Sequence, residues 1–403
     1  MIDSPLPWRW PPHSYQPELA IERYFADDGE LNIRGRDGVI ARCEDLLCEK
    51  FDQPRAVLLN SGTSALYAAF FAIDLRPGDE IIAPTVTFHA TATPALSWGA
   101  KVILVDVDPE TACIDPVACT AAISPRTKAI VTNAQWGHPV DQPRLRALCD
   151  QHQLRWIEDI SHAHGSAWQG KQVGTWGDLA SMSLGAEKIV TGGMAGVLMG
   201  RDDLLVDRAV LLTHYLFRSR SDVRTPGFGP LGRTGFGLKL GAYPLAAVLI
   251  EDQLKHHFDS WVEQRTDSLM RLREGLAGLT GLRVPVIRPE VTSMGGWYGF
   301  KPWVDQQLLG ITREELVSRL QQHGVEVDVP GSAALHTLPL FQDPRWQIAG
   351  WDKADLSAAK FTNADDYSHG TLSLPTFTGP DDEQKLQQTI AGFKRVWDGI
   401  PNS

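Results

Sequence analysis

Short apolar runs alternate with amphipathic segments through residues 56–159 of the chain. Continuous apolar runs predict buried strands, and apolar residues at helical spacing predict the helices between them. The expected strands are residues 56–59, 80–83, 101–107, 128–133 and 154–159, and the expected helices include residues 87–98, 115–123 and 144–152. This alternation is typical of an α/β fold with a doubly wound, mainly parallel sheet, whose ligands bind beyond the carboxyl ends of the strands.

The pattern changes in the second half of the chain. Residues 201–217 have helical spacing, whereas residues 218–241 show little periodicity, and a connection of that length is usually functional or interfacial. Residues 244–277 predict one long amphipathic helix that leads into a second, smaller domain. We therefore expect a surface arm without a clear period at 1–35, a large domain at 36–245 and a small α+β domain at 246–403, with the boundary inside the long helix.

Composition narrows the classes of function. The 403 residues are 43% hydrophobic, enough to bury a sizeable core, and 38 basic against 49 acidic residues give a net charge of −11. That balance argues against a general nucleic-acid or anionic-membrane surface. Five cysteines without CxxC pairs indicate free thiols rather than disulfides or a zinc site. Without a membrane-span run or a signal-peptide pattern, we expect a cytoplasmic protein with small-molecule partners, no nucleic acid and no membrane.

Two charged residues mark the stretch 156–200. Asp159 ends one apolar run, and Lys188 follows another inside a glycine-rich loop. A lysine that loses its water can become neutral and nucleophilic enough to form an imine, and a carboxylate can keep a pyridinium nitrogen protonated. Taken singly, Lys188 is equally a solvated loop lysine, and Asp159 a helix cap or loop acid. Together they match the two electronic demands of pyridoxal phosphate.

Small polar residues supply a candidate phosphate site. Gly62, Thr63 and Ser64 lie between an expected strand and an expected helix, where backbone N–H groups and hydroxyls can bind an anion. Ser183, shortly before Lys188, offers a further hydroxyl. The absence of a Walker lysine pattern argues against a nucleoside triphosphate.

With these residues in place, the chain resembles a known family. The segments that carry the resemblance are NSGTSAL, APTVTFHATATPAL, VILVDVDPET, IEDISHAHGS and VGTWGDLASMSLGAEK. They are similar to the DegT/DnrJ/EryC1/StrS family of pyridoxal-phosphate enzymes, the sugar aminotransferases of fold type I. The resemblance covers essentially the whole chain and is most specific at residues 60–200. It implies a homodimer with a large cofactor domain, a small C-terminal domain and active sites at the subunit interface.

The resemblance also implies roles for individual residues. Lys188 takes the Schiff-base position and Asp159 the position beside the pyridine nitrogen. Phe88 takes the position of the aromatic residue that stacks on the cofactor ring. His162 stands where the family usually has a glutamine near the ring hydroxyl, and an imidazole can donate the same hydrogen bond but can also titrate near neutrality. Thr63, Ser64 and Ser183 take phosphate positions.

Two segments depart from the family pattern. The family commonly continues after the lysine with a Gly-Glu-Gly turn, whereas residues 193–196 here read Gly-Met-Ala-Gly and lack the acid. The partner-subunit segment that usually places an asparagine on the phosphate corresponds best to residues 235–240, where Lys239 can supply a charge instead. Both departures leave cofactor binding credible but put the family's usual substrate in doubt.

The remaining histidines and tryptophans can also be explained by ordinary structural roles. His89 follows the stacking residue, and His336 lies in a segment that resembles a family loop near the substrate, yet both are also consistent with ordinary polar loop residues. Trp136 and Trp98 are interpreted as packing residues rather than as platforms for a substrate. The histidines near Asp159 lie in a segment without regular secondary structure and lack a fourth metal ligand, so no metal is expected.

These observations predict transamination. Lys188 would hold the cofactor and carry protons, while an amino group passes from glutamate or glutamine to a keto group on a sugar, cyclitol or related intermediate. An alternative keeps the cofactor but ends in elimination, cyclisation or carbon–carbon bond formation, as the altered turn at 193–196 and His162 suggest. A catalytically silent, cofactor-binding regulator is a further alternative, which the presence of both Lys188 and Asp159 argues against.

Overall fold

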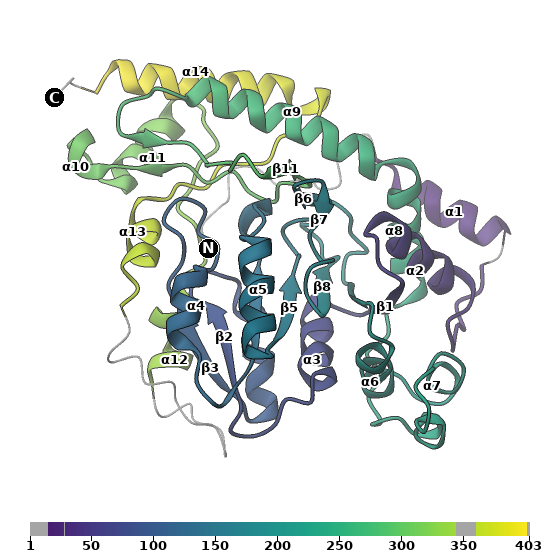
Figure 1. The fold of residues 1–403 in the computed structure, drawn as a ribbon. Coiled ribbons are helices and arrows are strands. Elements are labelled where there is room, and N and C mark those ends of the chain that lie inside the picture. The colour runs from purple at the N-terminus through teal and green to yellow at the C-terminus, as the bar shows by residue number, and fades with distance from the viewer. Residues whose placement is uncertain (1–14, 28, 344–359, 401–403) are drawn as a thin grey trace.

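A seven-stranded sheet in the order β1-β9-β8-β5-β4-β2-β3 forms the centre of the computed structural model, which describes residues 15–27, 29–343 and 360–400 (Figure 1). Its strands are β1 (Arg55–Leu59), β2 (Glu80–Pro84), β3 (Lys101–Val105), β4 (Thr127–Asn133), β5 (Arg155–Asp159), β8 (Leu179–Ser183) and β9 (Gly196–Gly200). Strands β3, β2, β4, β5 and β8 pair in parallel, and β9 runs antiparallel to both β8 and β1. The predicted α/β fold with a mainly parallel sheet is confirmed.

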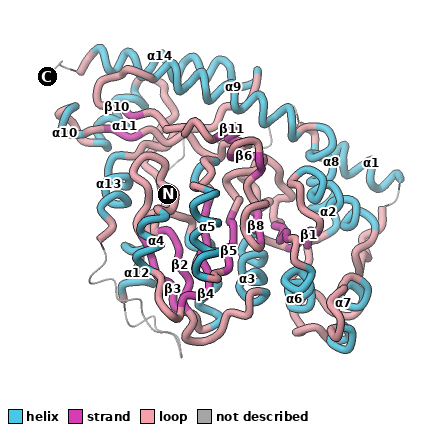
Figure 2. Tube along the Cα trace, viewed as in Figure 1, coloured by secondary structure: helices cyan, strands magenta, loops and turns pink. Residues whose placement is uncertain are grey.

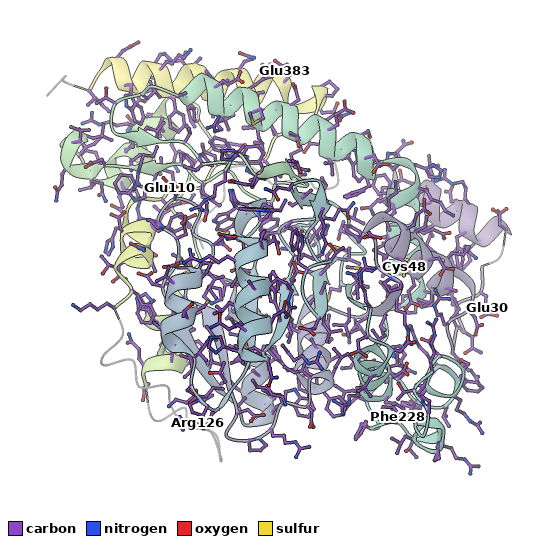
Figure 3. All side chains as sticks on the ribbon, viewed as in Figure 1. Glu30, Cys48, Glu110, Arg126, Phe228 and Glu383 are labelled. Carbon is purple, nitrogen blue, oxygen red and sulfur yellow. The ribbon has the colours of Figure 1, made fainter. Side chains whose placement is uncertain are left out.

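Helices cover both faces of the sheet, because alternate residues of a buried strand point to opposite sides. Trp156 of β5 packs toward α4 and α5, whereas its neighbour Ile157 packs toward α3 and α6. Leu58 of β1 faces the core shared with α2 and α8. Figure 2 shows the strands between these helices, and Figure 3 shows side chains filling the space between the layers. The helices are α2 (Gly38–Lys50), α3 (Gly62–Ala72), α4 (Pro116–Ala122), α5 (Gln142–His152), α6 (Asp203–Thr213) and α8 (Pro244–His256).

The C-terminal part builds its own core, in which Trp297, Phe300 and Phe393 are fully buried. Helices α9 (Phe258–Leu276) and α14 (Glu383–Asp398) lie side by side across it (Figure 1). The remaining elements are α10 (Gln306–Leu309), α11 (Arg313–Gln322), α12 (Pro339–Gln342), α13 (Thr362–Gly370), the strand pair β10 (Leu282–Arg283) and β12 (Trp303–Val304), and a small sheet of β6 (Ser166–Trp168), β7 (Lys171–Gln172) and β11 (Val291–Met294). The division into domains at residue 245 stays a prediction.

Three local expectations differ from the structure. The arm expected at 1–35 contains a helix, α1 (Pro17–Asp27), whose Ala20 and Tyr24 are buried, while residues 1–14 lie outside the described residues. The helix expected at 87–98 consists of two 3₁₀ helices, η1 (His89–Thr91) and η2 (Thr93–Trp98), since Pro94 lacks the N–H that a continuous helix needs. The single helix expected at 244–277 breaks at His257, whose φ of −130° is not helical.

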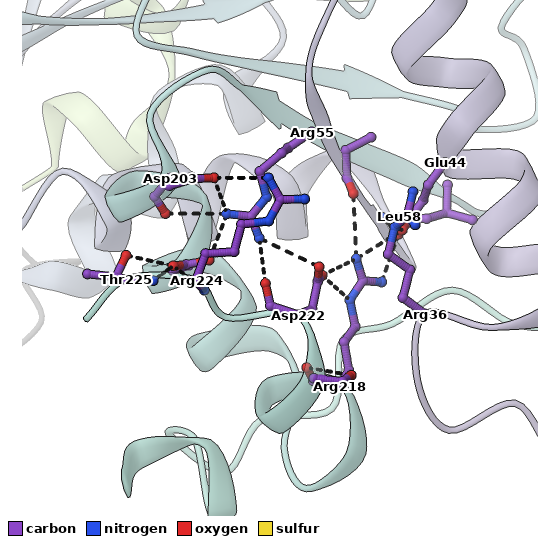
Figure 4. A network of polar contacts seen from close by, with 12 residues as sticks. Arg36, Glu44, Arg55, Leu58, Asp203, Arg218, Asp222, Arg224 and Thr225 are labelled. Carbon is purple, nitrogen blue, oxygen red and sulfur yellow. Dashed lines mark hydrogen bonds and ion pairs between the residues drawn. The ribbon is translucent and has the colours of Figure 1, made fainter. Parts of the chain in front are cut away.

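A network of buried ion pairs fastens the long connection after α6 to the body of the protein (Figure 4). Arg218, in the short helix α7 (Phe217–Ser221), donates to both carboxylate oxygens of Glu44 in α2 at 2.7 and 3.0 Å. Glu44 also accepts from the Leu58 backbone N–H at 2.7 Å, and both charged side chains are at most 1% exposed. Beside this pair, Arg55 binds Asp207 at 2.7 Å. Residues 218–241, expected to be a loop, therefore include an anchored helix and the 3₁₀ helix η4 (Gly229–Arg233).

Within the described residues, none of the helices combines the length and apolar character needed to cross a membrane.

Candidate active site

Asp159 lies at the carboxyl end of β5 and is held by two hydrogen bonds. The Thr91 hydroxyl donates to Oδ2 at 2.7 Å, and the Ser161 backbone N–H donates to Oδ1 at 3.1 Å. Thr91 is itself within 2.8 Å of the Thr87 hydroxyl. The side chain of Asp159 is buried, so these donors fix the direction in which its carboxylate points.

Lys188 lies in the connection between β8 and β9, five residues after Ser183. Its Nζ is 3.7 Å from the centroid of the Tyr298 ring. Loss of water around this amine lowers the pKa of Lys188 to about 8, although the charges of Asp159 and Glu187 oppose the shift. A neutral, nucleophilic amine is therefore available close to neutral pH, which an exposed lysine does not provide.

Three rings form a wall beside this lysine, which we call the aromatic wall: Trp136, His162 and Tyr298. Their planes lie within 15° of one another, and the His162 and Tyr298 centroids are 4.1 Å apart. Burial and the nearby Lys188 and Lys301 lower the pKa of His162 well below its ordinary value. This shift disfavours titration of His162 near neutrality, which the sequence left open. Its Nδ1 is buried without a hydrogen-bond partner, so a polar group is missing there.

The phosphate turn sits at the start of α3. Ser61 caps the helix by accepting from the Ser64 N–H at 3.1 Å, while Thr63 is exposed. A Cβ on Gly62 would lie 2.8 Å from the Cβ of Ser183, so this position needs glycine for the turn to approach β8. Gly196 is confined in the same way, since a Cβ there would meet the Gly62 nitrogen at 2.3 Å.

An open pocket of about 510 Å³ adjoins this turn. Its lining comes from the turn, from η2 and from the long connection before α8: Thr63, Ser64, Tyr67, Thr93, Pro94, Ser97, Leu238 and Leu240. Lys239 is exposed between the two lining leucines, so its charge lies in the segment that borders the phosphate turn. Within one chain, Leu238 and Leu240 thus border the same pocket as Thr63 and Ser64, whereas the expected contribution of residues 235–240 from the partner subunit stays a prediction.

The other aromatic and histidine candidates differ in whether their rings are exposed or already engaged by neighbouring residues. Phe88 and His89 pack ring to ring at 4.2 Å, and Phe88 is 54% exposed, which leaves a face open to a planar ligand. His336 is different, because Thr85 lies 2.7 Å from its Nδ1, Asp365 lies 3.0 Å from its Nε2, and Phe361 stacks on its ring. Both nitrogens of His336 are engaged, so the structure favours the ordinary structural reading of this residue.

Among the residues that the structure describes, His, Cys, Asp and Glu side chains form no group of three that could hold a metal ion.

Three residues of the site escaped the sequence patterns: Thr91, Tyr298 and Lys301. Thr91 stands within an expected helix and carries no motif of its own. Tyr298 and Lys301 lie in residues 296–303, where the sequence predicts a strand but the structure is irregular up to β12. The available signal was the run GGWYGFKPW, where adjacent glycines beside aromatic residues and a lysine mark a close approach of backbone.

The lowered pKa of Lys188 makes a direct prediction. The rate at which acetic anhydride modifies Lys188 in the cofactor-free protein should rise with pH and reach half its limit near pH 8, because the neutral amine is the reactive form. Peptide mass spectrometry after short pulses measures this rate, with the exposed Lys171 in the same digest reporting reagent decay. A midpoint above about pH 10, where ordinary lysines titrate, would contradict the desolvated environment.

Comparison with known proteins assigns the chain to a family. The model described as the DegT/DnrJ/EryC1/StrS aminotransferase family matches residues 32–392. This chain belongs to that family. The resemblance inferred from the sequence is confirmed, and with it the class of enzyme, an aminotransferase.

Individual relatives agree with the family assignment. The chain is 35% identical over 290 residues to a Streptomyces kanamyceticus protein named as an L-glutamine:3-amino-2,3-dideoxy-scyllo-inosose aminotransferase; the match covers 70% of this chain and 66% of that one. It is 30% identical over 341 residues to the spore coat polysaccharide biosynthesis protein SpsC of Bacillus subtilis, covering 81% and 82%. The crystal structure of an aminotransferase from Psychrobacter cryohalolentis superposes with a TM-score of 0.85 at 24% identity, covering 97% and 99%, and so shares the fold.

Proposed function

We propose that this chain is a pyridoxal-phosphate-dependent aminotransferase that moves an amino group from glutamate or glutamine to a keto group of a sugar, cyclitol or related intermediate. The observation that carries the proposal is the pairing of Lys188, a desolvated amine with a pKa near 8, with Asp159, whose carboxylate lies within electrostatic reach and is fixed by Thr91. These are the covalent and electrostatic partners that such a cofactor requires.

The residues present fit the cofactor. The buried, unpartnered Nδ1 of His162 offers a hydrogen-bonding atom toward the ring hydroxyl, and Asp159 offers a carboxylate toward the ring nitrogen. Phe88 offers an open aromatic face. The phosphate would lie against the start of α3, with Gly62, Thr63, Ser64 and Ser183 as its neighbours and Lys239 as a further charge. When bound, pyridoxal phosphate supplies an electron-withdrawing ring that stabilises negative charge on the substrate α-carbon.

The protein side chains then divide the remaining work. With the cofactor bound, the Nζ of Lys188 would be its covalent partner and would also carry the proton of the donor's α-carbon. Tyr298 lies against that amine and keeps water from it. Asp159 would hold the ring nitrogen of the cofactor, since the hydrogen bonds from Thr91 and Ser161 fix the direction of its carboxylate.

The names of the relatives support the proposed substrates. The Streptomyces kanamyceticus protein is named for glutamine as donor and for an inosose, a keto cyclitol, as acceptor. We also propose a homodimer, in which apolar residues of the long connection meet the partner subunit. The support is a set of exposed apolar side chains there: Tyr215, Leu216, Phe217, Leu231, Phe236 and Tyr243. A cytoplasmic location is part of the same proposal.

A single-turnover assay tests the proposal. Purified protein loaded with pyridoxal phosphate should release the corresponding 2-oxo acid from glutamine or glutamate, in an amount equal to the active sites, without any acceptor present. Addition of scyllo-inosose as a probe acceptor should then permit further release. If neither donor yields a 2-oxo acid, transamination fails and the alternative outcomes of elimination, cyclisation or carbon–carbon bond formation take its place.

Replacing Asp159 by asparagine should leave cofactor attachment intact but lower kcat by about a hundredfold or more, because the negative charge at the ring nitrogen is lost while the shape is kept. Borohydride trapping followed by intact-mass measurement should show the same covalent loading as in the wild type. Asp150→Asn, which makes the same change at a solvent-exposed carboxylate on α5, is the control. A kcat within a factor of three of the wild type would remove Asp159 from the proposed role.

A further inference from the structure

A second lysine stands at the aromatic wall without a role in the scheme above. Lys301 Nζ lies 4.5 Å from the centroid of the Trp136 ring and forms a hydrogen bond with the Ser373 hydroxyl. An ammonium group has three donors, and one hydroxyl and one ring face do not use all of them. Within the described part of the chain, no carboxylate forms an ion pair with Lys301, so its charge is not neutralised by the protein.

The aromatic wall places this second amine beside the first. The Trp136 and Tyr298 rings lie 6.1 Å apart, with only 2° between their planes. Lys301 contacts the first ring and Lys188 the second. Burial and the nearby Lys188 and Lys301 together lower the pKa of His162, so both amines lie close enough to act on this ring. Below its pKa of about 8, the Lys301 ammonium beside a wall of neutral rings makes that space attractive to an anion.

The nearby acids do not cancel this charge. Glu187 accepts a hydrogen bond from the Tyr298 hydroxyl at 3.0 Å and reaches Lys301 only at a longer range, as does Asp328. Trp136 is held in place by its Nε1, which donates to the Tyr367 hydroxyl at 2.7 Å. The Trp136 ring under Lys301 is therefore held by a hydrogen bond of its own.

We propose that Lys301, seated on Trp136, binds a carboxylate of the amino donor and thereby positions the donor's α-carbon next to Lys188. This inference rests on the proposed function. An amino acid carries its carboxylate on the same carbon as the reacting amine, so the group that binds the carboxylate has to lie near the reactive lysine. The keto cyclitol named for the relative carries no anionic group, which favours the donor as the source.

A structural role predicts something different from a binding role. If Lys301 served only to pack on Trp136, its replacement would lower stability and would affect every substrate alike. If it binds a carboxylate, removal of its charge should raise the KM of the donor and leave the KM of a neutral acceptor unchanged. A charged hydrogen bond of this kind corresponds to about a tenfold effect or more.

Three variants separate these readings. Lys301→Met removes the charge and keeps the apolar stem, and Lys301→Arg keeps a cation. Lys171→Met is the matched control, because Lys171 also lies over a tryptophan, with its Nζ 4.1 Å from the Trp176 ring centroid, but on the exposed strand β7. Melting temperatures verify that each variant is folded.

The measurements are the affinity for glutarate, a dicarboxylate that cannot react, and the KM values for glutamine and scyllo-inosose. We expect Lys301→Met to weaken glutarate binding and raise the glutamine KM by about tenfold or more, Lys301→Arg to recover part of both, and Lys171→Met to change neither. Unchanged glutarate affinity in Lys301→Met, or an effect on the acceptor KM alone, would overturn the proposal. Glutarate binding needs no turnover, so it tests Lys301 even if the wild type proves not to transaminate.

Discussion

Replacing Lys188 by alanine should abolish turnover, with a loss of at least about 10⁴-fold in kcat, because in the proposed mechanism the same amine would serve as nucleophile and as proton carrier. Covalent loading should disappear as well, so that borohydride no longer adds the mass of the cofactor to the chain. The measurement is kcat from the release of 2-oxo acid, paired with intact-mass spectra before and after borohydride.

The same variant should remain folded. The amine of Lys188 is desolvated in the folded protein, so its pKa is lower there than in the unfolded chain, and the folded state binds the proton less tightly. That difference costs stability near neutral pH and disappears as the pH rises toward the ordinary lysine value. We therefore expect Lys188→Ala to melt no lower than the wild type at pH 7.

Two controls make the result specific. Added methylamine should restore part of the activity of Lys188→Ala by replacing the missing amine, which a misfolded protein would not allow. Lys171→Ala, on the exposed strand β7, should behave as the wild type. More than a tenth of wild-type activity in Lys188→Ala would exclude the proposed chemistry.

Arg218→Met is expected to destabilise the protein by about 3–5 kcal/mol, since it leaves the Glu44 carboxylate buried without its bidentate partner. Arg36 and the Leu58 N–H remain near Glu44 but offer a single contact each. Urea unfolding of the cofactor-free protein measures the change in the free energy of unfolding.

A double variant and a surface pair complete this experiment. Glu44→Leu combined with Arg218→Met should recover much of the loss, because no charge is then left in the core. Arg319→Met breaks a solvent-exposed pair with Glu315 on α11 and should cost about 1 kcal/mol or less. An equal cost for Arg218→Met and Arg319→Met would mean that the buried network does not hold the long connection in place.

The sheet was accessible from sequence because its strands are buried on both faces and so read as continuous apolar runs. The C-terminal part was less accessible. Its sequence predicts strands at residues 325–329 and 370–374, but in the structure these residues contribute isolated bridges such as that between Asp328 and Ser373. Their apolar residues pack into the C-terminal core instead of forming a continuous series of strand hydrogen bonds. The break at His257 was also hidden, since an amphipathic pattern continues on both sides of it.

The candidate site divides along similar lines. Asp159 and Lys188 follow apolar runs. A carboxylate and an amine at such positions are typical of a site that binds pyridoxal phosphate. Tyr298 and Lys301 reach the same place from more than a hundred residues away, and only the folded chain shows that they face Trp136 and His162. Thr91 is a single hydroxyl whose importance depends on a 2.7 Å contact with Asp159, which sequence spacing does not encode.

The contact among Gly62, Ser183 and Gly196 has a consequence for attempts to redesign this enzyme. Three separate segments touch there through their backbones, and a single methyl group at either glycine would push the start of α3 away from β8 and β9. A mutant library aimed at the phosphate end should therefore leave both glycines fixed and vary Thr63 and Lys239, whose side chains face open space. Such a library would keep the spacing of α3, β8 and β9 while it changes the side chains beside the phosphate turn.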